Sequence, residues 1–353
     1  MRLKSPSFLP ATAVLELTYA CNHQCLFCSC PWEAGRSFEK LDELTTVQWK
    51  EILEQLCDLG VSSFAFTGGE ALLRDDCIEL MEHASTLQAI KTETIDGKLV
   101  QHRKTPELYL LSNGSTLTEE IMGFLAEKDV KLSISLPGLS TFKEHTGHDN
   151  ADMVLGWFRR AKELGIQTTV NSTVTALNLH ELPKTLSAAF LAGAGQLLMN
   201  RFLPGGRGLA HAHRLVLNLE QVREMLSAAD DILVRANRTG HLGTEIPLCA
   251  LDGLELKKLQ VGTRCSAARG FFVIGPSGYV RVCNHSEHRL SHITRWRDLK
   301  ENDYWRTFTM KTYLPAECRG CGRMTECDGG CREAANVFLG SVAAPDPLLT
   351  PSS

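Results

Sequence analysis

The chain has 353 residues, 43% of them apolar and 22% charged, with a net charge of −4. This balance is typical of a globular protein and excludes a strong field that would favour nucleic acid or an anionic membrane. The first residues contain no apolar segment long enough for a secretory signal peptide, and no run approaches the ~20 apolar residues of a membrane-spanning helix. We therefore expect a cytoplasmic protein.

Short β-like runs alternate with amphipathic helical patterns through the first two thirds of the chain. The predicted strands are Ala13–Leu17, Ser62–Phe66, Leu108–Ser112, Lys131–Ser135, Gln167–Thr173 and Gln196–Phe202. The predicted helices between them are Thr45–Leu59, Asp75–Ser85, Thr118–Lys128, Met153–Leu164 and Leu182–Leu191. This alternation predicts an α/β fold with a parallel sheet, and six units predict a partial (β/α)6 barrel with ligands at the carboxyl ends of its strands.

One connection in this pattern is unusually long. It runs over Thr86–Pro106 and contains Asp96-Gly97 between two β-like runs. A dipeptide of this type between such runs predicts a β-hairpin. The hairpin is either a surface ornament or an arm beside the substrate entrance.

The composition changes near residue 240, where a cysteine-rich region begins. We expect a barrel domain over residues 10–240 and a smaller cysteine-rich C-terminal domain over residues 241–340. Within the second domain, Phe271–Ile274 and Tyr279–Val282 predict a short hairpin. Residues 341–353 are rich in Pro and Ser and are expected to form a disordered tail.

The thirteen cysteines argue against a secreted disulfide framework, since the chain has no export signal, an odd count and a size that needs no cross-links. Cys21, Cys25 and Cys28 directly follow the first predicted strand. Three thiolates on one loop can hold three irons of a cubane cluster and leave the fourth iron open to a substrate. A closed zinc site, with Cys30 or His23 as the fourth ligand, is the alternative.

The spacing C-x3-C-x2-C after a first strand, followed by Thr67-Gly-Gly-Glu70 after the second, resembles the radical S-adenosylmethionine superfamily. The resemblance implies a [4Fe–4S] cluster on Cys21, Cys25 and Cys28 with S-adenosylmethionine bound to its open iron. In that family the reduced cluster cleaves the cofactor to a 5′-deoxyadenosyl radical. The radical then abstracts hydrogen from a substrate.

The same resemblance implies a set of cofactor contacts at the strand ends. An aromatic residue before the third cysteine would lie near the adenine, the Gly-Gly-Glu turn near the methionine, and later strand ends near the ribose and carboxylate. These residues are Phe27, Gly68, Gly69, Glu70, Asn113, Ser135, Thr173 and Asn200. The chain departs from the pattern at Pro137 and Thr146, which stand where many relatives have Asp and Arg.

The C-terminal cysteines resemble the SPASM extension of this superfamily, so that the likeness covers residues 13–335. By matching order, one auxiliary [4Fe–4S] cluster would be held by Cys249, Cys265, Cys283 and Cys331, and three corners of a second by Cys318, Cys321 and Cys327. The cysteine expected farther downstream is missing. The second cluster would then have a non-cysteine ligand such as Asp346, have an open iron, or be absent. A zinc ribbon is the alternative for the whole region.

Enzymes with this extension mostly act on peptides or proteins. The resemblance therefore implies maturation of a ribosomally made peptide by crosslinking, oxidation or epimerisation, with an electron donor such as flavodoxin or ferredoxin. Because the chain begins almost at its first strand, we expect a separate protein to recognise the peptide leader. The alternatives are a radical enzyme for a small molecule (a tetrapyrrole, sugar or alcohol) and a non-catalytic metal-binding partner protein.

Overall fold

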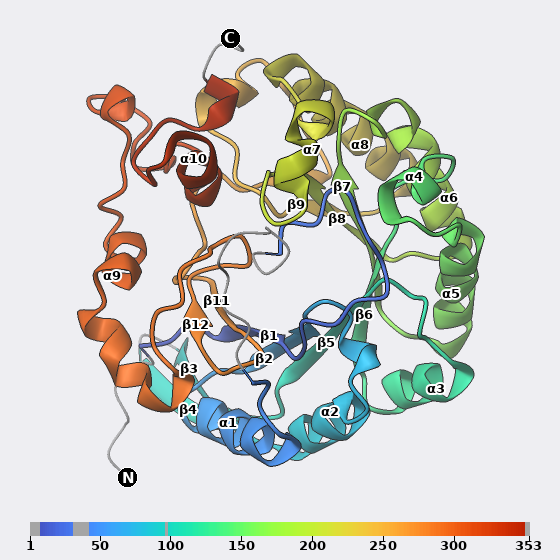
Figure 1. Cartoon of the computed structure of the whole chain (residues 1–353), viewed down its shortest axis with the longest axis vertical. Helices are drawn as coiled ribbons and strands as arrows, with labels where there is room; N and C mark the ends of the chain where they lie inside the picture. Colours follow the sequence, from blue (N-terminus) through green and yellow to red (C-terminus); the bar gives the residue numbers. More distant parts are fainter. Residues whose placement is uncertain (1–7, 31–41, 96–97, 350–353) are drawn as a thin grey trace.

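The computed structural model describes residues 8–30, 42–95 and 98–349. A curved, mostly parallel sheet lies at its centre, with helices around the outside of the curve (Figure 1). The strands of this sheet are β1 Thr12–Glu16, β2 Ser63–Thr67, β5 Glu107–Ser112, β6 Lys131–Ser135, β7 Thr168–Val174, β8 Gln196–Arg201, β9 Gly240–Leu242, β10 Leu259–Val261, β11 Phe271–Ile274 and β12 Val280–Arg281. The α/β fold expected from the sequence is thus confirmed.

The strand order follows the chain through the six predicted βα units. It runs β10-β9-β8-β7-β6-β5-β2-β1-β11-β12, and every neighbouring pair is parallel except β11 with β12. All six predicted strands are present, and their bounds differ from the predicted ones by a residue or so. The carboxyl ends of β1, β2 and β5 to β8 therefore lie along one edge of the sheet.

The helices are α1 Thr46–Asp58, α2 Cys77–Thr86, α3 Glu119–Glu127, α4 Phe142–Thr146, α5 Ala151–Leu164, α6 Leu182–Ala192, α7 Gly208–Leu215, α8 Leu219–Ala236, α9 Asp303–Thr309 and α10 Arg332–Leu339. The sequence of helix α8 contains signals for its start, its end and its buried face. Asn218 and Gln221 form a capping box at its start, and Asn237 ends it in the left-handed conformation. Val222, Leu226 and neighbouring apolar residues form its buried face.

Residues alternate in character along the inner strands. Ile134, Val170 and Met199 are fully buried in the hydrophobic core between sheet and helices. The alternate positions of the same strands are mostly polar, as at Ser135 and Asn200, with Leu198 as an apolar exception, and are more exposed than their neighbours. Because successive side chains point to opposite faces of a strand, the concave face of these three strands carries mainly polar side chains.

The expected domain boundary at residue 240 does not separate two structural units. Strands β9 and β10 extend the barrel sheet beyond β8, and β11 pairs in parallel with β1 at the other end. The predicted hairpin is confirmed as β11 and β12. Strands of two to four residues carry too little periodicity to be assigned to a sheet from sequence, so the continuity could not be predicted.

The predicted hairpin in the long connection is also present, as β3 Ala89–Ile95 and β4 Lys98–Lys104, while its turn lies outside the described residues. Arg103 of β4 lies 3.8 Å from Asp58, the last residue of α1. That end of α1 leads into the start of β2, at the amino ends of the strands. The hairpin is therefore a surface ornament, and the expectation of an arm beside the substrate entrance is wrong.

The expected disordered tail is wrong for residues 341–349. The Asp346 side chain is completely buried and pairs with Arg201 at the end of β8, with oxygen–nitrogen distances of 2.5 and 3.0 Å. A buried ion pair holds this segment in place, which its Pro- and Ser-rich composition does not reveal. Residues 350–353 lie outside the described part of the chain. No helix among the described residues is both long and apolar enough to cross a membrane.

Candidate active site

The loop that carries Cys21, Cys25 and Cys28 directly follows β1 at the carboxyl edge of the sheet. Backbone hydrogen bonds fix it to neighbouring loops. The Gln24 and Leu26 amides donate to carbonyl oxygens of α4 at 3.1 and 2.8 Å, and the Cys28 carbonyl accepts from the Gly208 amide at 3.0 Å. The loop conformation is therefore set by the segments that follow β6 and β8.

The three thiols of this loop lie close to one another. Burial raises the pKa of Cys25, and the neighbouring thiols of Cys28 and Cys21 raise it further. Arg207 acts in the opposite direction and favours the thiolates of Cys21 and Cys25. Three neighbouring thiols on one loop, beside the positive charge of Arg207, fit the donor set of a cubane cluster with an open iron.

The Gly-Gly-Glu turn after β2 packs directly on the chain that enters this loop. The Gly69 amide donates to the Thr18 carbonyl at 3.0 Å, and the Glu70 amide donates to the Ala20 carbonyl at 2.8 Å. A Cβ on Gly69 would overlap the Ala20 carbonyl, and Gly68 has a φ of +139° that L side chains rarely adopt. Both glycines are thus needed for the close approach of two backbone segments.

Glu70 joins this turn to the end of β5. Its carboxylate is 1% exposed and accepts the Asn113 amide at 2.7 Å, and burial raises its pKa. The Asn113 side chain in turn donates to the Asn22 side chain at 2.9 Å. Glu70 and Asn113, both predicted as cofactor contacts, are therefore brought together next to Cys21.

The remaining predicted contacts lie on the concave face of the sheet. Thr173 of β7 is paired with Asn200 of β8 in the register, and Ser135 of β6 is paired with Asn171. The Asn200 side chain donates to that of Asn171 at 3.4 Å. The Phe27 ring lies on the cysteine loop, 5.9 Å from the His145 ring. The structure thus brings the strand-end residues into one polar surface beside the loop.

Arg207 was not singled out by the sequence. Its Nη1 donates to the Cys25 carbonyl at 3.3 Å, and the adjacent Gly206 has a φ of +48° with its Cα facing the Cys30 and Cys28 carbonyls. Sequence analysis can recognise the Pro-Gly-Gly-Arg-Gly segment as a glycine-rich loop. It cannot show that these glycines let an arginine approach a cysteine loop almost two hundred residues earlier in the chain.

The departures at Pro137 and Thr146 lie in a segment that supports the cysteine loop. Thr146 presents its carbonyl to the Gln24 amide at 3.1 Å, and its hydroxyl donates to the Phe142 carbonyl at 2.9 Å. The Pro137 carbonyl accepts from the side chain of Asn178. Their contacts are structural, and neither residue supplies a charge.

The C-terminal cysteines fall into two groups that differ from those expected by order. Cys249 lies with Cys318, Cys321 and Cys327. Burial raises the pKa of Cys318, and the charges of Cys327, Cys249 and Cys321 raise it further. The Leu248 amide donates to the Cys327 sulfur at 3.4 Å. The grouping of Cys249 with Cys265, which the order of the cysteines suggests, stays a prediction.

The second group consists of Cys265, Cys283 and Cys331, which line one small cavity. Burial raises the pKa of Cys283, and the charges of Glu333, Cys331 and Cys265 raise it further. Among the described residues, no three histidine, cysteine or carboxylate side chains are placed to bind one metal ion. A cubane cluster binds each cysteine to a different iron, so its ligands need not converge on one point.

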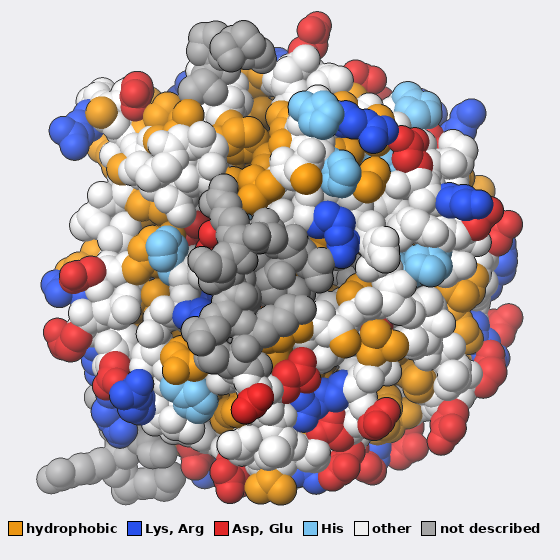
Figure 2. Space-filling view, viewed as in Figure 1, with side chains coloured by type: hydrophobic (Ala, Val, Ile, Leu, Met, Phe, Trp, Pro, Cys, Tyr) orange, Lys and Arg blue, Asp and Glu red, His pale blue; other side chains and the backbone are white. Residues whose placement is uncertain are grey.

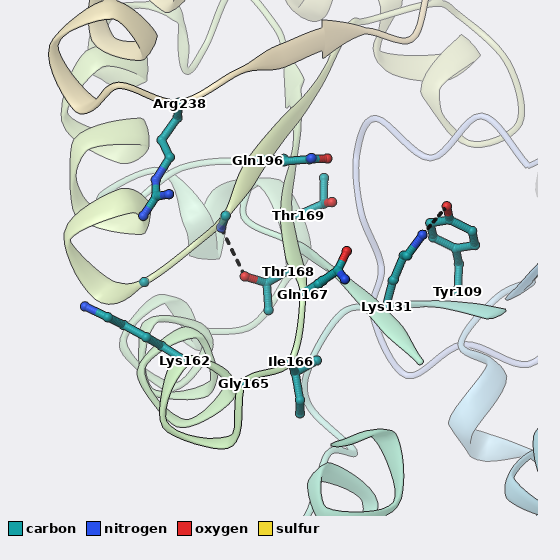
Figure 3. A pocket seen from close by; sticks show the side chains of 12 residues that line it. Tyr109, Lys131, Lys162, Gly165, Ile166, Gln167, Thr168, Thr169, Gln196 and Arg238 are labelled. Atoms are coloured by element: carbon teal, nitrogen blue, oxygen red, sulfur yellow. Dashed lines mark hydrogen bonds between the residues drawn. The ribbon is translucent and has the colours of Figure 1, made fainter. Parts of the chain in front are cut away.

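A larger cavity, of about 470 Å³, lies at the other end of the barrel, where β6, β7 and β8 begin (Figure 3). Its lining includes Lys131, Lys162 and Arg238, and Lys131 donates to the Tyr109 hydroxyl at 3.1 Å. None of the predicted cofactor contacts lines it. On the face that carries the carboxyl ends, acidic and basic side chains are interspersed around the rim (Figure 2).

The chain is similar in sequence to a known family and to several known proteins. Residues 15–189 match the family model described as Radical SAM superfamily. The PqqA peptide cyclase of Bradyrhizobium diazoefficiens is 28% identical over 356 residues, which covers 96% of this chain and 86% of that protein. The PqqA peptide cyclase of Gluconobacter oxydans is 27% identical, with coverage of 99% and 92%.

Two solved structures share the fold. SuiB of Streptococcus suis has a TM-score of 0.72 at 16% identity and covers 97% of this chain and 77% of its own. The native anSMEcpe with bound AdoMet has a TM-score of 0.70 at 17% identity, with coverage of 96% and 94%. The fold that this chain shares with each of the two proteins therefore extends through its cysteine-rich region.

Proposed function

We propose that the chain, whose residues 15–189 match the Radical SAM superfamily model, is a member of that family and modifies a peptide by radical chemistry. The observation that carries the proposal is the loop of Cys21, Cys25 and Cys28, held at the carboxyl edge of a partial barrel beside Glu70 and Arg207. A [4Fe–4S] cluster and S-adenosylmethionine, when bound, would supply hydrogen abstraction from an unactivated carbon.

The residues around this loop would position and shield the cofactors. Cys21, Cys25 and Cys28 would be the cluster ligands, and Arg207 would add a positive charge next to them. Gly68 and Gly69 would hold the loop against β2, while Ser135, Thr173 and Asn200 would offer hydrogen bonds from the concave face. The protein's contribution is thus orientation and exclusion of water.

The relatives named for an action on the peptide PqqA, which align with nearly the whole chain, support a peptide as substrate. The cysteine-rich region would hold auxiliary clusters, which suit a reaction that removes an electron from a substrate radical. We further propose that a flavodoxin or ferredoxin reduces the protein and that a separate protein recognises the peptide leader. Clustered thiols favour the reducing cytoplasm as its location.

Anaerobic reaction of the reconstituted protein with short peptides encoded beside its gene tests the proposal. Mass spectrometry should show loss of about two hydrogens for crosslinking or oxidation. For epimerisation, the peptide mass should stay unchanged in ordinary water and rise by about one deuterium in heavy water. A Cys25→Ala variant is the matched control and should leave each peptide unmodified. Cofactor cleavage with no change in any peptide, but turnover of a tetrapyrrole, sugar or alcohol, would contradict a peptide substrate.

A further inference from the structure

Two segments far apart in the sequence enclose the first group of C-terminal cysteines. The Leu248 amide donates to the Cys327 sulfur at 3.4 Å, which places Cys249 beside that residue. Arg323 and Asp252 join the same two segments by a paired ion contact at 2.6 and 3.1 Å. The chain between Leu248 and Asp252 is therefore fastened to the loop that carries Cys318, Cys321 and Cys327.

A sharp turn separates Cys327 from Cys331. Gly329 and Gly330, between them, have φ values of +76° and +91°, which L side chains rarely adopt. Cys331 then starts α10, where its amide donates to the buried Asp346 carboxylate at 2.8 Å. The turn directs two cysteines only four residues apart toward different surroundings.

The second group of cysteines shares its cavity with Glu245. Ser266 holds Oε1 of this carboxylate with its amide at 3.0 Å and its hydroxyl at 2.9 Å. Cys265, Cys283 and Cys331 line this cavity together with Glu245. A carboxylate therefore faces the same small space as the three thiols of this group.

Glu333 lines the same cavity but is committed to other contacts. Its carboxylate accepts the Tyr304 hydroxyl at 2.6 Å and the Asn336 side chain at 3.3 Å. Both oxygens of Glu333 thus accept hydrogen bonds, whereas the two contacts from Ser266 both go to Oε1 of Glu245. Glu245 is therefore better placed than Glu333 to complete the donor set.

We propose that the fold divides the C-terminal cysteines into a four-thiolate cluster site and a three-thiolate site whose fourth ligand is a carboxylate. The four-thiolate site consists of Cys249, Cys318, Cys321 and Cys327. The second site consists of Cys265, Cys283 and Cys331 with Glu245. Cys249 thereby replaces the missing downstream cysteine. The proposal rests on the proposed role of these cysteines as cluster ligands and is independent of the substrate.

The division is tested on full-length protein in which Cys21, Cys25 and Cys28 are replaced by alanine, so that only auxiliary iron remains. Mössbauer spectra of the anaerobically reconstituted protein should contain two cluster components. Cys249→Ala and Cys321→Ala should each remove the same component, about half of the iron, and the double variant should lose no more. Cys249→Ala combined with Cys265→Ala should lose nearly all of it.

The opposite pattern would overturn the division. If Cys249→Ala removes the same component as Cys265→Ala, the cysteines pair as their order in the sequence suggests. Cys57→Ala, which removes a buried core thiol of α1, is the matched control and should retain both components. A colourless protein that carries zinc at these cysteines would also overturn the proposal.

The carboxylate ligand is tested in the same background. Glu245→Gln keeps the size of the side chain and should alter the spectrum of the Cys265 component alone, while Glu245→Cys should convert it to an all-thiolate spectrum. Glu333→Gln is the control from the same cavity and should leave both components unchanged. His285 lines the same cavity and is the other side chain that could serve as a ligand. An unaltered spectrum in Glu245→Gln, or a change in His285→Ala instead, would overturn the assignment.

These spectra need neither S-adenosylmethionine nor a substrate. Failure of the peptide reaction would therefore leave the two cluster components in place. Conversely, loss of the predicted pattern of components would leave peptide modification open to its own test.

Discussion

At the scale of single residues, Gly69 leaves no room for a side chain, since a Cβ there would overlap the Ala20 carbonyl oxygen. A methyl group at residue 69 must push the chain that leads into Cys21 away from β2. We expect Gly69→Ala to lower the free energy of unfolding by about 1–3 kcal/mol, as overpacking does, and to reduce the iron bound by the loop. Chemical denaturation and iron analysis of the purified variant measure both.

Gly123 of α3 offers the matched control, since a Cβ there meets nothing within 4 Å. Gly123→Ala should leave iron binding intact and stabilise the helix by about 0.5–1 kcal/mol. If both glycine variants retain their iron equally, the turn after β2 does not position the cysteine loop.

A second residue-scale prediction concerns the buried pair of Arg201 and Asp346, whose side chains are 4% and 0% exposed. Asp346→Ala leaves the Arg201 charge and the Cys331 amide without their acceptor. Removing one partner of a buried pair costs about 3–5 kcal/mol, which denaturant unfolding would detect. Glu79→Ala, which breaks an exposed pair with Lys50, should cost less than about 1 kcal/mol. Equal losses in the two variants would contradict the structural role of Asp346.

At the scale of elements, Glu181 ties the loop after β6 to the start of α6. Its carboxylate accepts the amides of Leu139 and Thr141 at 3.1 Å and that of Ser140 at 2.9 Å. Burial alone would raise the pKa of Glu181, but hydrogen bonds from Ser140 and Thr141 outweigh it and lower the pKa from 4.5 to about 2. The folded state therefore favours the ionised form.

This depressed pKa predicts a pH dependence with a definite sign. The contribution of Glu181 is complete above its unfolded value of 4.5 and is lost as the pH falls toward about 2. The free energy of unfolding should therefore decrease less between pH 6 and pH 4 in Glu181→Gln than in the unsubstituted protein. Glu144→Gln, at an exposed carboxylate paired with Arg214, should keep the original slope. A Glu181→Gln slope equal to the original would contradict the account.

Some elements of this fold are easier to predict from the sequence than others. The six strands and their helices were predictable because each unit buries an apolar face with a clear period. The positions of Cys21 and Glu70 followed from their place after consecutive strands. The place of Cys249 beside Cys327 could not be predicted from the sequence. It depends on contacts between residues 248–252 and the loop that ends at Cys327. Asp346 was misjudged because composition does not reveal a buried ion pair.

At the scale of the whole molecule, the barrel and the cysteine-rich region form one continuous sheet, since β9 and β11 join it at opposite ends. Arg201 of β8 reaches Asp346 near the C-terminus, and the same carboxylate accepts the Cys331 amide. The barrel and the C-terminal cysteine groups thus belong to one packed body.

The most direct test of the central claim is the transfer of hydrogen from peptide to cofactor. The reconstituted protein would be incubated anaerobically with S-adenosylmethionine and a substrate peptide deuterated at its α-carbons and side-chain carbons, and the 5′-deoxyadenosine analysed by mass spectrometry. We predict that 5′-deoxyadenosine gains deuterium from the peptide in the unsubstituted protein and is not formed by Cys25→Ala. Formation of 5′-deoxyadenosine without deuterium, at a rate that the peptide does not change, would contradict it.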